Sequence, residues 1–288
     1  GITAAMKAPV GLNLLSEVYP QRVIDVGIAE QHALTMAAGM AFAGMHPVVA
    51  LYATFLNRAY DQLLMDVAMH RAPVTVVLDR AGITGADGAS HNGMWDIAMA
   101  AMIPGMCLAA PRDEATLRSQ LRQAVAIDDG PSLVRYRKGS MPAPIEALES
   151  LEGMDWLYRS HKQGAGKRVL LVAAGAMAEP MLAAAAQLEA LGYVPDVIDP
   201  CWLLPINPAL VELTRGYDLV VSAEDGLVDG GFGSALRDQM ELAKLFVPTV
   251  RIGIAKQFLD TATRAQLMAD MGMDSSGIVA RVQDFFEQ

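Results

Sequence analysis

The chain has 288 residues, of which 53% are hydrophobic and 19% are charged. This composition supplies enough apolar side chains for a core, so it excludes a disordered or fibrous protein, and the length predicts two domains. The net charge is −10, from 22 Lys and Arg against 32 Asp and Glu, so we expect no nucleic-acid partner. No apolar run is long enough to span a bilayer, so we expect no membrane-spanning segment.

The first half of the chain alternates β-branched apolar runs with longer helical stretches. Strands are predicted over residues 22–26, 47–52, 74–79, 106–109 and 132–136, and helices over 29–43, 55–69, 95–102 and 113–127. Such β-α-β alternation is typical of a parallel sheet with helices on both faces. We therefore expect an α/β fold, with a doubly wound first domain over residues 1–140.

The middle of the chain breaks this rhythm, which then restarts. Residues 141–166 hold Pro142, Pro144 and several glycines among mixed charges, which indicates an interdomain linker. The later strands are predicted over 168–174, 194–199, 219–223 and 249–254, and the helices over 178–191, 208–214, 233–243, 263–271 and 275–286. This pattern predicts a second doubly wound, mostly parallel-sheet domain over residues 167–288.

The cysteines and the start of the sequence give expectations about the cellular compartment and about a signal peptide. Cys107 and Cys201 stand far apart in apolar contexts, so we interpret them as buried thiols of a reducing compartment rather than as a disulfide or a metal site. The sequence opens at Gly1 without a charged-then-apolar leader, so we expect no signal peptide, a cytoplasmic protein and a first strand that is cut short.

Polar and aromatic side chains gather where the predicted strands of the first domain end. Because ligands bind at the carboxyl ends of parallel strands, this edge is a candidate site. The side chains are Glu30 and His32 after the first strand, Tyr52, Phe55 and Arg58 after the second, Arg80, Asp87 and His91 after the third, and Arg135 after the last. Taken singly, Glu30 could simply favour a helix dipole and Phe55 could simply fill the core.

Four motifs stand in order along this domain: DVGIAEQH at 25–32, YATFLNRAYDQ at 52–62, DRAGITGADG at 79–88 and DGPSLVRY at 129–136. Together they resemble the 1-deoxy-D-xylulose-5-phosphate synthase family of transketolase-like thiamine diphosphate enzymes. The resemblance is dense from residue 2 to about residue 139 and continues more thinly through SAEDG at 222–226 and GGFGS at 230–234. It implies a pyrimidine-side domain that binds one half of the cofactor, followed by the family's carboxy-terminal domain.

The resemblance implies a cofactor-binding role for four of these residues. Glu30 matches the glutamate that hydrogen-bonds a ring nitrogen of the cofactor's aminopyrimidine and so promotes loss of the thiazolium proton, which makes it a catalytic residue. A carboxyl group in an apolar pocket is suited to sharing a proton in this way. Phe55 would stack on the pyrimidine face, Ile28 would pack nearby, and Arg58 would line the same pocket.

The family's substrates are pyruvate and D-glyceraldehyde 3-phosphate, which are joined with loss of CO₂. Arg80 and Arg135 match the family's phosphate-binding arginines, and arginine suits bidentate contacts to phosphate. Tyr52 and Asp87 match other substrate-binding residues, and His91 matches a residue near the acceptor's hydroxyls that could also move protons near neutral pH. His32 belongs to the signature, but no role is assigned to it.

One part of the family pattern is missing from this sequence. The family holds the cofactor's diphosphate and Mg²⁺ with a Gly-Asp-Gly segment and a later Asn, and the segments GADG, EDG and DGG of this chain lack that form. We therefore expect no metal ligand in this chain, an N-terminal domain elsewhere that holds the diphosphate and Mg²⁺, and no activity for the chain alone. Sites of this type lie between domains or subunits, so a homodimer is expected.

Three other interpretations stay open. A β subunit of a 2-oxoacid dehydrogenase has the same two domains and a similar length, although the motifs at 52–62 and 79–88 favour the synthase. An inactive fragment that serves as a dimerisation module would also lack the metal motif. A fragment of a transketolase is the third interpretation.

Overall fold

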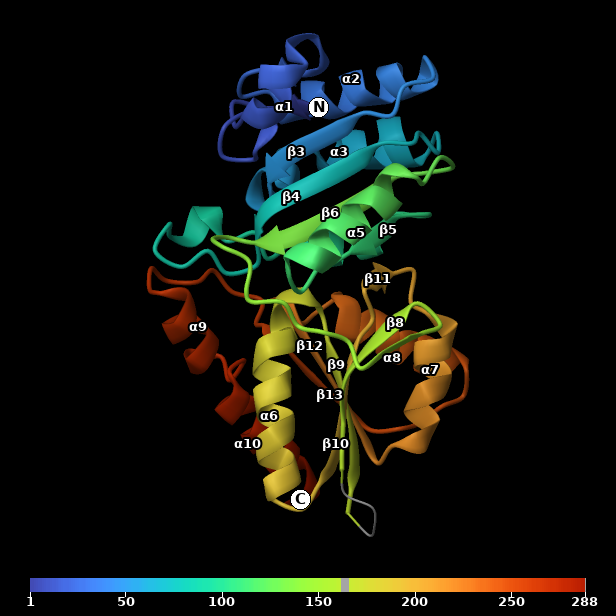
Figure 1. Ribbon diagram of the computed structural model, residues 1–288, viewed down its shortest axis with the longest axis vertical. Coiled ribbons are helices and arrows are strands. Elements are labelled where there is room, and N and C mark those ends of the chain that lie inside the picture. Colours follow the sequence, from blue (N-terminus) through green and yellow to red (C-terminus); the bar gives the residue numbers. More distant parts are fainter. Residues whose placement is uncertain (162–165, 288) are drawn as a thin grey trace.

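Two β-sheets, one above the other along the long axis, form the framework of the chain (Figure 1). The computed structural model describes residues 1–161 and 166–287. Within this part of the chain, the first sheet has the order β11-β5-β6-β4-β3-β1-β2, and its pairings are parallel except that of β11 with β5. The strands are β1 (Ile2–Thr3), β2 (Ile24–Asp25), β3 (Val48–Tyr52), β4 (Thr75–Ala81), β5 (Cys107–Ala109), β6 (Ser132–Arg137) and β11 (Trp202–Leu204).

The second sheet has the order β13-β12-β9-β10-β8-β7 within the described residues. Strands β13, β12, β9 and β10 run parallel to one another, whereas β8 and β7 form an antiparallel hairpin at the edge. The bounds are β7 (Glu149–Leu151), β8 (Met154–Arg159), β9 (Arg168–Ala173), β10 (Val194–Asp199), β12 (Leu219–Leu227) and β13 (Thr249–Ile254). Two mostly parallel sheets with flanking helices confirm the predicted α/β fold class.

The hairpin of β7 and β8 lies inside the segment 141–166, which the sequence predicts as a linker. Its strand β8 buries Met154, Trp156 and Leu157 to 6% exposure or less, so it belongs to the folded core. Strand β7 is exposed along its whole length, and charged residues interrupt the apolar side chains of β8. Neither strand therefore shows the continuous apolar run that identifies the buried parallel strands, and the second sheet begins before residue 167.

Helices cover both faces of each sheet. In the second half, α6 and α10 lie on one side of the sheet, and α7 and α8 lie on the other (Figure 1). No helix in the described ranges is long and apolar enough to cross a membrane. The helices are α1 (Leu12–Val18), α2 (Glu30–Phe42), α3 (Tyr60–Gln62), α4 (Asp96–Ala101), α5 (Glu114–Val125), α6 (Ala178–Ala190), α7 (Pro208–Leu213), α8 (Phe232–Leu242), α9 (Arg264–Asp270) and α10 (Ser275–Glu287).

The segment after β3 departs from the single helix predicted over 55–69. It forms a 3₁₀ helix over Ala53–Ala59, then α3, and then a π-helical turn over Leu63–Ala68. Ala53, Leu56 and Ala59 are buried at a spacing of three residues, which matches the three residues per turn of a 3₁₀ helix. The tighter winding leaves Phe55 half-buried and Arg58 exposed just beyond the end of β3.

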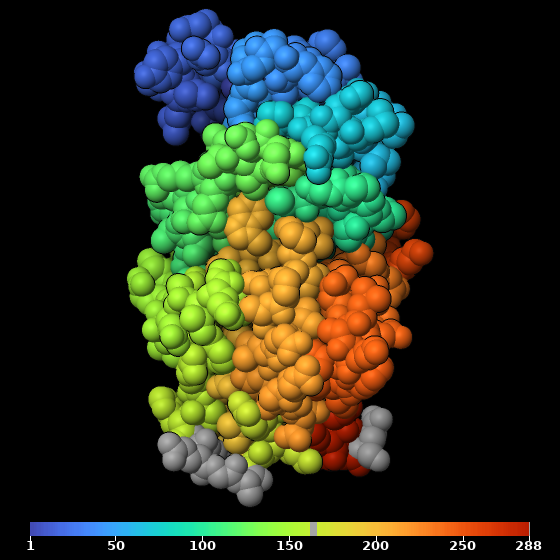
Figure 2. All heavy atoms as spheres, turned by 90° about the vertical axis from the view of Figure 1, so that its right-hand side faces the viewer, coloured from blue at the N-terminus to red at the C-terminus, as the bar shows by residue number. Residues whose placement is uncertain are grey.

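Strand β11 crosses from the second half of the chain to the first sheet. It pairs antiparallel with β5, and the amide of Ala110 donates to the carbonyl oxygen of Cys201 at 3.2 Å. Figure 2 shows the gold-coloured segment near residue 200 reaching up against the green atoms of the first half. Cys107 and Cys201 are free and, contrary to the expectation of buried thiols, only half-buried. The two sheets are therefore interlocked by the chain itself rather than merely placed end to end.

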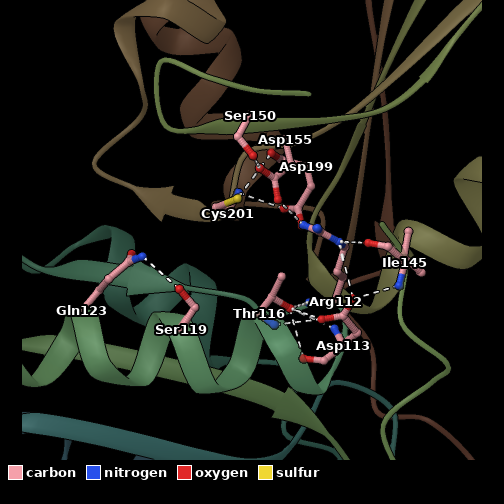
Figure 3. A network of polar contacts seen from close by, with 10 residues as sticks. All are labelled: Arg112, Asp113, Thr116, Ser119, Gln123, Ile145, Ser150, Asp155, Asp199 and Cys201. Carbon is pink, nitrogen blue, oxygen red and sulfur yellow. Dashed lines mark hydrogen bonds and ion pairs between the residues drawn. The ribbon is translucent and has the colours of Figure 1, made fainter. Parts of the chain in front are cut away.

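A buried arginine fixes the junction of the two sheets (Figure 3). Arg112, which follows β5, is 5% exposed, and its Nη1 lies 2.6 Å from Asp155 Oδ2 and 2.8 Å from Asp199 Oδ2. Its Nε also donates to the carbonyl oxygen of Ile145 at 3.0 Å. Burial raises the pKa of Asp199 to about 6, although the charge of Arg112 opposes that shift. Removing Arg112 would therefore leave a buried carboxylate without its cation.

We expect Arg112→Leu to lower the free energy of unfolding by about 3 kcal/mol, because breaking a buried ion pair strands the remaining charge. Urea denaturation followed by circular dichroism measures the change. The matched control is Arg118→Leu, since Arg118 pairs with Glu114 on the surface at 2.7 Å, and there the expected change is within about 0.5 kcal/mol. Equal losses in the two variants would contradict the role given to Arg112.

Candidate functional site

Two neighbouring strands of the first sheet bring an aromatic ring and a guanidinium together at their carboxyl ends. Tyr52 of β3 stands opposite Asp79 of β4 in the register of the sheet. The next residue, Arg80, has φ +61, and its guanidinium carbon lies 4.1 Å from the centroid of the Tyr52 ring. A non-glycine residue in the left-handed region is uncommon and is often held there at a functional site. The backbone at Arg80 thus aims its cation across the strand end.

Phe55 sits at the centre of a row of three rings. It stacks on Tyr52 with centroids 5.9 Å apart and an interplanar angle of 16°. His91, from the loop after β4, meets Phe55 edge-on with centroids 5.8 Å apart. The Thr54 hydroxyl donates to the carbonyl oxygen of Ser90 at 2.9 Å, which holds that loop against the 3₁₀ helix. Two separate strand ends therefore build one aromatic surface.

Glu30 is the first residue of α2 and is 2% exposed. Its Oε2 lies 3.6 Å from Arg58 Nη1, which is an ionic contact beyond ordinary hydrogen-bond distance. Within residues 1–161 and 166–287, no donor makes a hydrogen bond to this carboxylate. Arg58 also lies over the Phe55 ring at 5.5 Å, so it connects Glu30 with the aromatic row. The Glu30 oxygens are not among the fully buried unpaired atoms of the described residues, so a donor from a ligand could reach this acceptor.

Asp87 lies between two cations. Its Oδ1 is 2.5 Å from Lys138 Nζ, and its Oδ2 is 3.3 Å from Arg80 Nη1. The hydrogen bond from Lys138, together with the charges of Lys138 and Arg80, lowers the pKa of Asp87 from its usual range. Lys138 was not among the predicted site residues, although its position directly after β6 could have identified it. This edge of the sheet therefore carries two cations from two different strand ends.

Arg135 makes none of the contacts described above, and the phosphate-binding role that the resemblance implies for it stays a prediction. It lies within β6, opposite Leu78 of β4, and is 3% exposed. Its Nε donates to Asp96 Oδ2 at 2.7 Å, and its Nη2 donates to the carbonyl oxygen of Asp225 at 2.7 Å. Burial raises the pKa of Asp96, and the charge of Arg135 opposes that rise. These two hydrogen bonds tie β6 to α4 and β12, and within the described residues no hydrogen bond is made by Arg135 Nη1.

The structure thus brings together seven of the predicted residues by direct contacts: Glu30, Arg58, Phe55, Tyr52, Arg80, Asp87 and His91. Ile28 precedes α2 by two residues, and its side chain is 77% exposed. The described residues contain no group of three or more His, Cys, Asp or Glu side chains that could hold a metal ion. The site is therefore a buried carboxylate beside an aromatic row, with a pair of cations at its far side.

Two family models together match most of the chain. The transketolase pyrimidine-binding domain matches residues 1–144, and the transketolase C-terminal domain matches residues 159–278. The 1-deoxy-D-xylulose-5-phosphate synthase of Frankia casuarinae is 52% identical over 98% of this chain and 43% of its own length. That of Corynebacterium glutamicum is 49% identical over 98% of this chain and 45% of its own. The chain thus spans less than half the length of these relatives.

Solved structures share this architecture. A chain described as a split-gene transketolase, inactive β4 tetramer, has a TM-score of 0.82 and 28% identity, and the match covers 98% of this chain and 90% of that one. Transketolase from Campylobacter jejuni has a TM-score of 0.79 with 18% identity, over 99% of this chain and 43% of its own. At that identity the second match shows the fold alone.

The contact between Lys138 and Asp87 predicts a measurable titration. The Asp87 carboxyl should titrate below the ordinary aspartate range, and Lys138→Met should move its midpoint upward because the hydrogen-bonding cation is lost. Carboxyl ¹³C shifts followed by NMR as pH falls give both midpoints. Lys7→Met is the matched control, since Lys7 is exposed at the start of the chain. A midpoint that stays the same in Lys138→Met would show that the pair does not form in solution.

Proposed function

Because this chain belongs to the transketolase family and matches the carboxy-terminal part of 1-deoxy-D-xylulose-5-phosphate synthases, we propose that it supplies the pyrimidine side of such an enzyme's active site. The reaction would be the thiamine diphosphate-dependent condensation of pyruvate with D-glyceraldehyde 3-phosphate to 1-deoxy-D-xylulose 5-phosphate and CO₂. The observation that carries this proposal is the buried carboxylate of Glu30, which lacks a donor and lies beside an aromatic surface. The synthase name of the relatives favours this reaction over that of a 2-oxoacid dehydrogenase.

The residues fit the aminopyrimidine half of the cofactor. Glu30 offers a hydrogen-bond acceptor that is 2% exposed, and Phe55 offers a half-buried ring that a flat heteroaromatic ring can stack on. Ile28, with 77% of its surface exposed, is free to pack against a ligand beside Glu30. When bound, thiamine diphosphate supplies the nucleophilic carbon that makes loss of CO₂ from pyruvate possible.

Glu30 would hold a proton at the ring nitrogen of the pyrimidine. The positive end of α2 and the guanidinium of Arg58 at 3.6 Å both stabilise the carboxylate while it accepts that hydrogen bond. Arg58 also contacts the Phe55 ring, so it holds the stacking surface and the carboxylate in one arrangement. The three side chains would therefore orient the ring and control its protonation together.

The acceptor's phosphate would bind between Arg80 and Lys138. The structure places both cations on Asp87, at 3.3 Å and 2.5 Å, so their charges are directed to one point. A dianionic phosphate competes well for such a pair because charge-assisted hydrogen bonds are strong. Tyr52 supports Arg80 through its ring, and His91 stands beside Phe55, where it would exchange a proton with the acceptor's oxygen. We add Lys138 to this phosphate site beside Arg80, and the phosphate contact that the resemblance implies for Arg135 stays a prediction.

Another segment of polypeptide would hold the diphosphate and Mg²⁺. The matched relatives are more than twice as long as the matched region, which leaves room for such a domain. The split-gene transketolase chain of similar fold is described as inactive in its β4 tetramer, and this parallel supports a requirement for a partner domain. We also propose a homodimer in the cytoplasm, as for a site shared between subunits. Adding the diphosphate-binding domain should restore carboligation, which an inactive dimerisation module would not show.

We expect Glu30→Gln to lower kcat at least about a hundredfold in the enzyme that contains both domains, because an amide cannot share the proton at the ring nitrogen. Circular dichroism should show the fold retained. Turnover is measured by coupling product formation to a reductase. Glu17→Gln, on the exposed face of α1, is the control and should turn over normally. Near-normal turnover of Glu30→Gln would refute the assignment.

Lys138→Met should raise the KM for D-glyceraldehyde 3-phosphate by about tenfold or more and leave the KM for pyruvate within about twofold, because only the acceptor carries a phosphate. Unphosphorylated D-glyceraldehyde serves as a second acceptor, and its KM should not respond to the substitution. The steady-state rates are measured with each substrate varied in turn. A similar rise for both acceptors would remove the phosphate role from Lys138.

A further inference from the structure

The second domain contacts one loop of the first domain, and that loop carries two residues of the proposed acceptor site. We propose that Asp225 and Arg264 are positioning residues that set the shape of the acceptor loop, defined as residues 82–93, and thereby the affinity for the phosphorylated aldehyde. This inference rests on the proposed function, because Asp87 and His91 of this loop are the groups assigned to the acceptor.

Both backbone groups of Ile83 bind to the second domain. The amide of Ile83 donates to Asp225 Oδ1 at 3.1 Å, and its carbonyl oxygen accepts from Arg264 Nη1 at 2.9 Å. Arg264 Nη1 also lies 2.6 Å from Asp225 Oδ2, so the two side chains act as one clamp on a single peptide unit. Ile83 itself is fully buried. The start of the acceptor loop is therefore fixed by residues about 140 and 180 positions later in the chain.

The loop has glycine where the second domain approaches it most closely. Gly82 has φ +74, and a Cβ there would lie 2.1 Å from Asp225 Cγ. Gly85 has φ +77, and a Cβ there would lie 2.9 Å from the backbone nitrogen of Arg264. Figure 1 shows the teal loop beside the red segment that leads into α9. Asp225 and the backbone of Arg264 therefore approach residues 82 and 85 so closely that a side chain at either position would prevent the contact.

Hydrogen bonds inside the acceptor loop connect the fixed residue Ile83 with the part of the loop that holds the proposed acceptor residues. Asn92 is 1% exposed, and its Oδ1 accepts from the amide of Thr84 at 2.9 Å and from the Thr84 hydroxyl at 3.2 Å. The amide of Gly82 donates to the carbonyl oxygen of Gly93 at 2.8 Å and closes the loop at its base. Asp87 and His91 lie between these fixed points, so the clamp at Ile83 sets where they stand.

Asp225 is itself held from the first domain. Its carbonyl oxygen accepts from Arg135 Nη2 at 2.7 Å, and Arg135 is paired with Asp96. Asp225 is 1% exposed, so a shift of this residue would disturb a buried ionic group. The buried Arg135 therefore also has a positioning role, because it orients Asp225, which in turn binds the start of the acceptor loop. Misplacement of a binding group by about 1 Å can cost a large factor in rate or affinity.

The test compares two arginines of the second domain in the enzyme that contains both domains. Arg264→Gln replaces the guanidinium that donates to the Ile83 carbonyl oxygen and pairs with Asp225 by a shorter, uncharged side chain. Arg251→Gln is the matched control, because Arg251 is also partly buried and donates to the Val228 carbonyl oxygen at 3.2 Å and to Ser234, without contact to the loop. Two readouts are used: hydrogen exchange of the amides in residues 82–93 without substrate, and the KM for each substrate.

Arg264→Gln should speed exchange at the start of the loop by about tenfold and raise the KM for D-glyceraldehyde 3-phosphate by about tenfold, while the KM for pyruvate stays within about twofold. Arg251→Gln should change none of these. Unchanged exchange in Arg264→Gln would overturn the clamp. Faster exchange with an unchanged acceptor KM, or with equal rises for both substrates, would overturn the positioning role.

A second variant keeps the test decisive when Arg264→Gln fails to fold. Asp225→Asn combined with Arg264→Gln leaves no buried charge of this pair unmatched but still lacks the guanidinium that reaches the Ile83 carbonyl, so it should fold and show the same acceptor-specific rise. A double variant with wild-type KM values would overturn the inference. The unmodified enzyme separates the two proposals: failure to condense the substrates refutes the proposed function, whereas the exchange measurement still decides whether the second domain holds the loop.

Discussion

The carboxylate of Glu30 is buried, and a buried carboxylate needs a hydrogen-bond donor or a cation beside it. The other residues of the site surround this one group. Leaving a buried polar group unsatisfied costs about 1–3 kcal/mol, and more for a charged group. Arg58 meets the requirement only in part, at 3.6 Å, and within the described residues no donor completes it. The fold therefore maintains an acceptor that a ligand can satisfy, next to the ring of Phe55. The assignment of the cofactor side depends on this incomplete pairing.

The sheet determines which other groups surround that acceptor. Because β3 and β4 are parallel and in register, Tyr52 and Arg80 emerge side by side, and the motif after each strand could be located from sequence. The strand β6 ends at Arg137, one residue later than predicted, and Lys138, which directly follows it, is not among the predicted site residues. Strand ends are the least certain part of a sequence-based assignment, so a residue directly after a strand is easily missed.

Contacts between the two halves could not be predicted from local patterns. The alternation of apolar runs predicts the buried parallel strands, but β7 is short and exposed, charged residues interrupt β8, and β11 is short. Strands β8 and β11 join their sheets by pairing with the distant strands β10 and β5. The pairs of Arg112 with Asp199 and of Asp225 with Ile83 likewise join residues far apart in sequence. The buried charges of the second domain therefore define the junction and also bind the start of the loop that carries Asp87 and His91.

The central claim is that Glu30 meets the pyrimidine ring of thiamine diphosphate. A crystal structure of the enzyme containing both this chain and the diphosphate-binding domain, with the cofactor and Mg²⁺, tests it most directly. We expect a nitrogen of the pyrimidine ring at about 2.7 Å from the Glu30 carboxylate, with that ring against Phe55. A cofactor whose ring lies elsewhere, with Glu30 still paired only with Arg58, would contradict it.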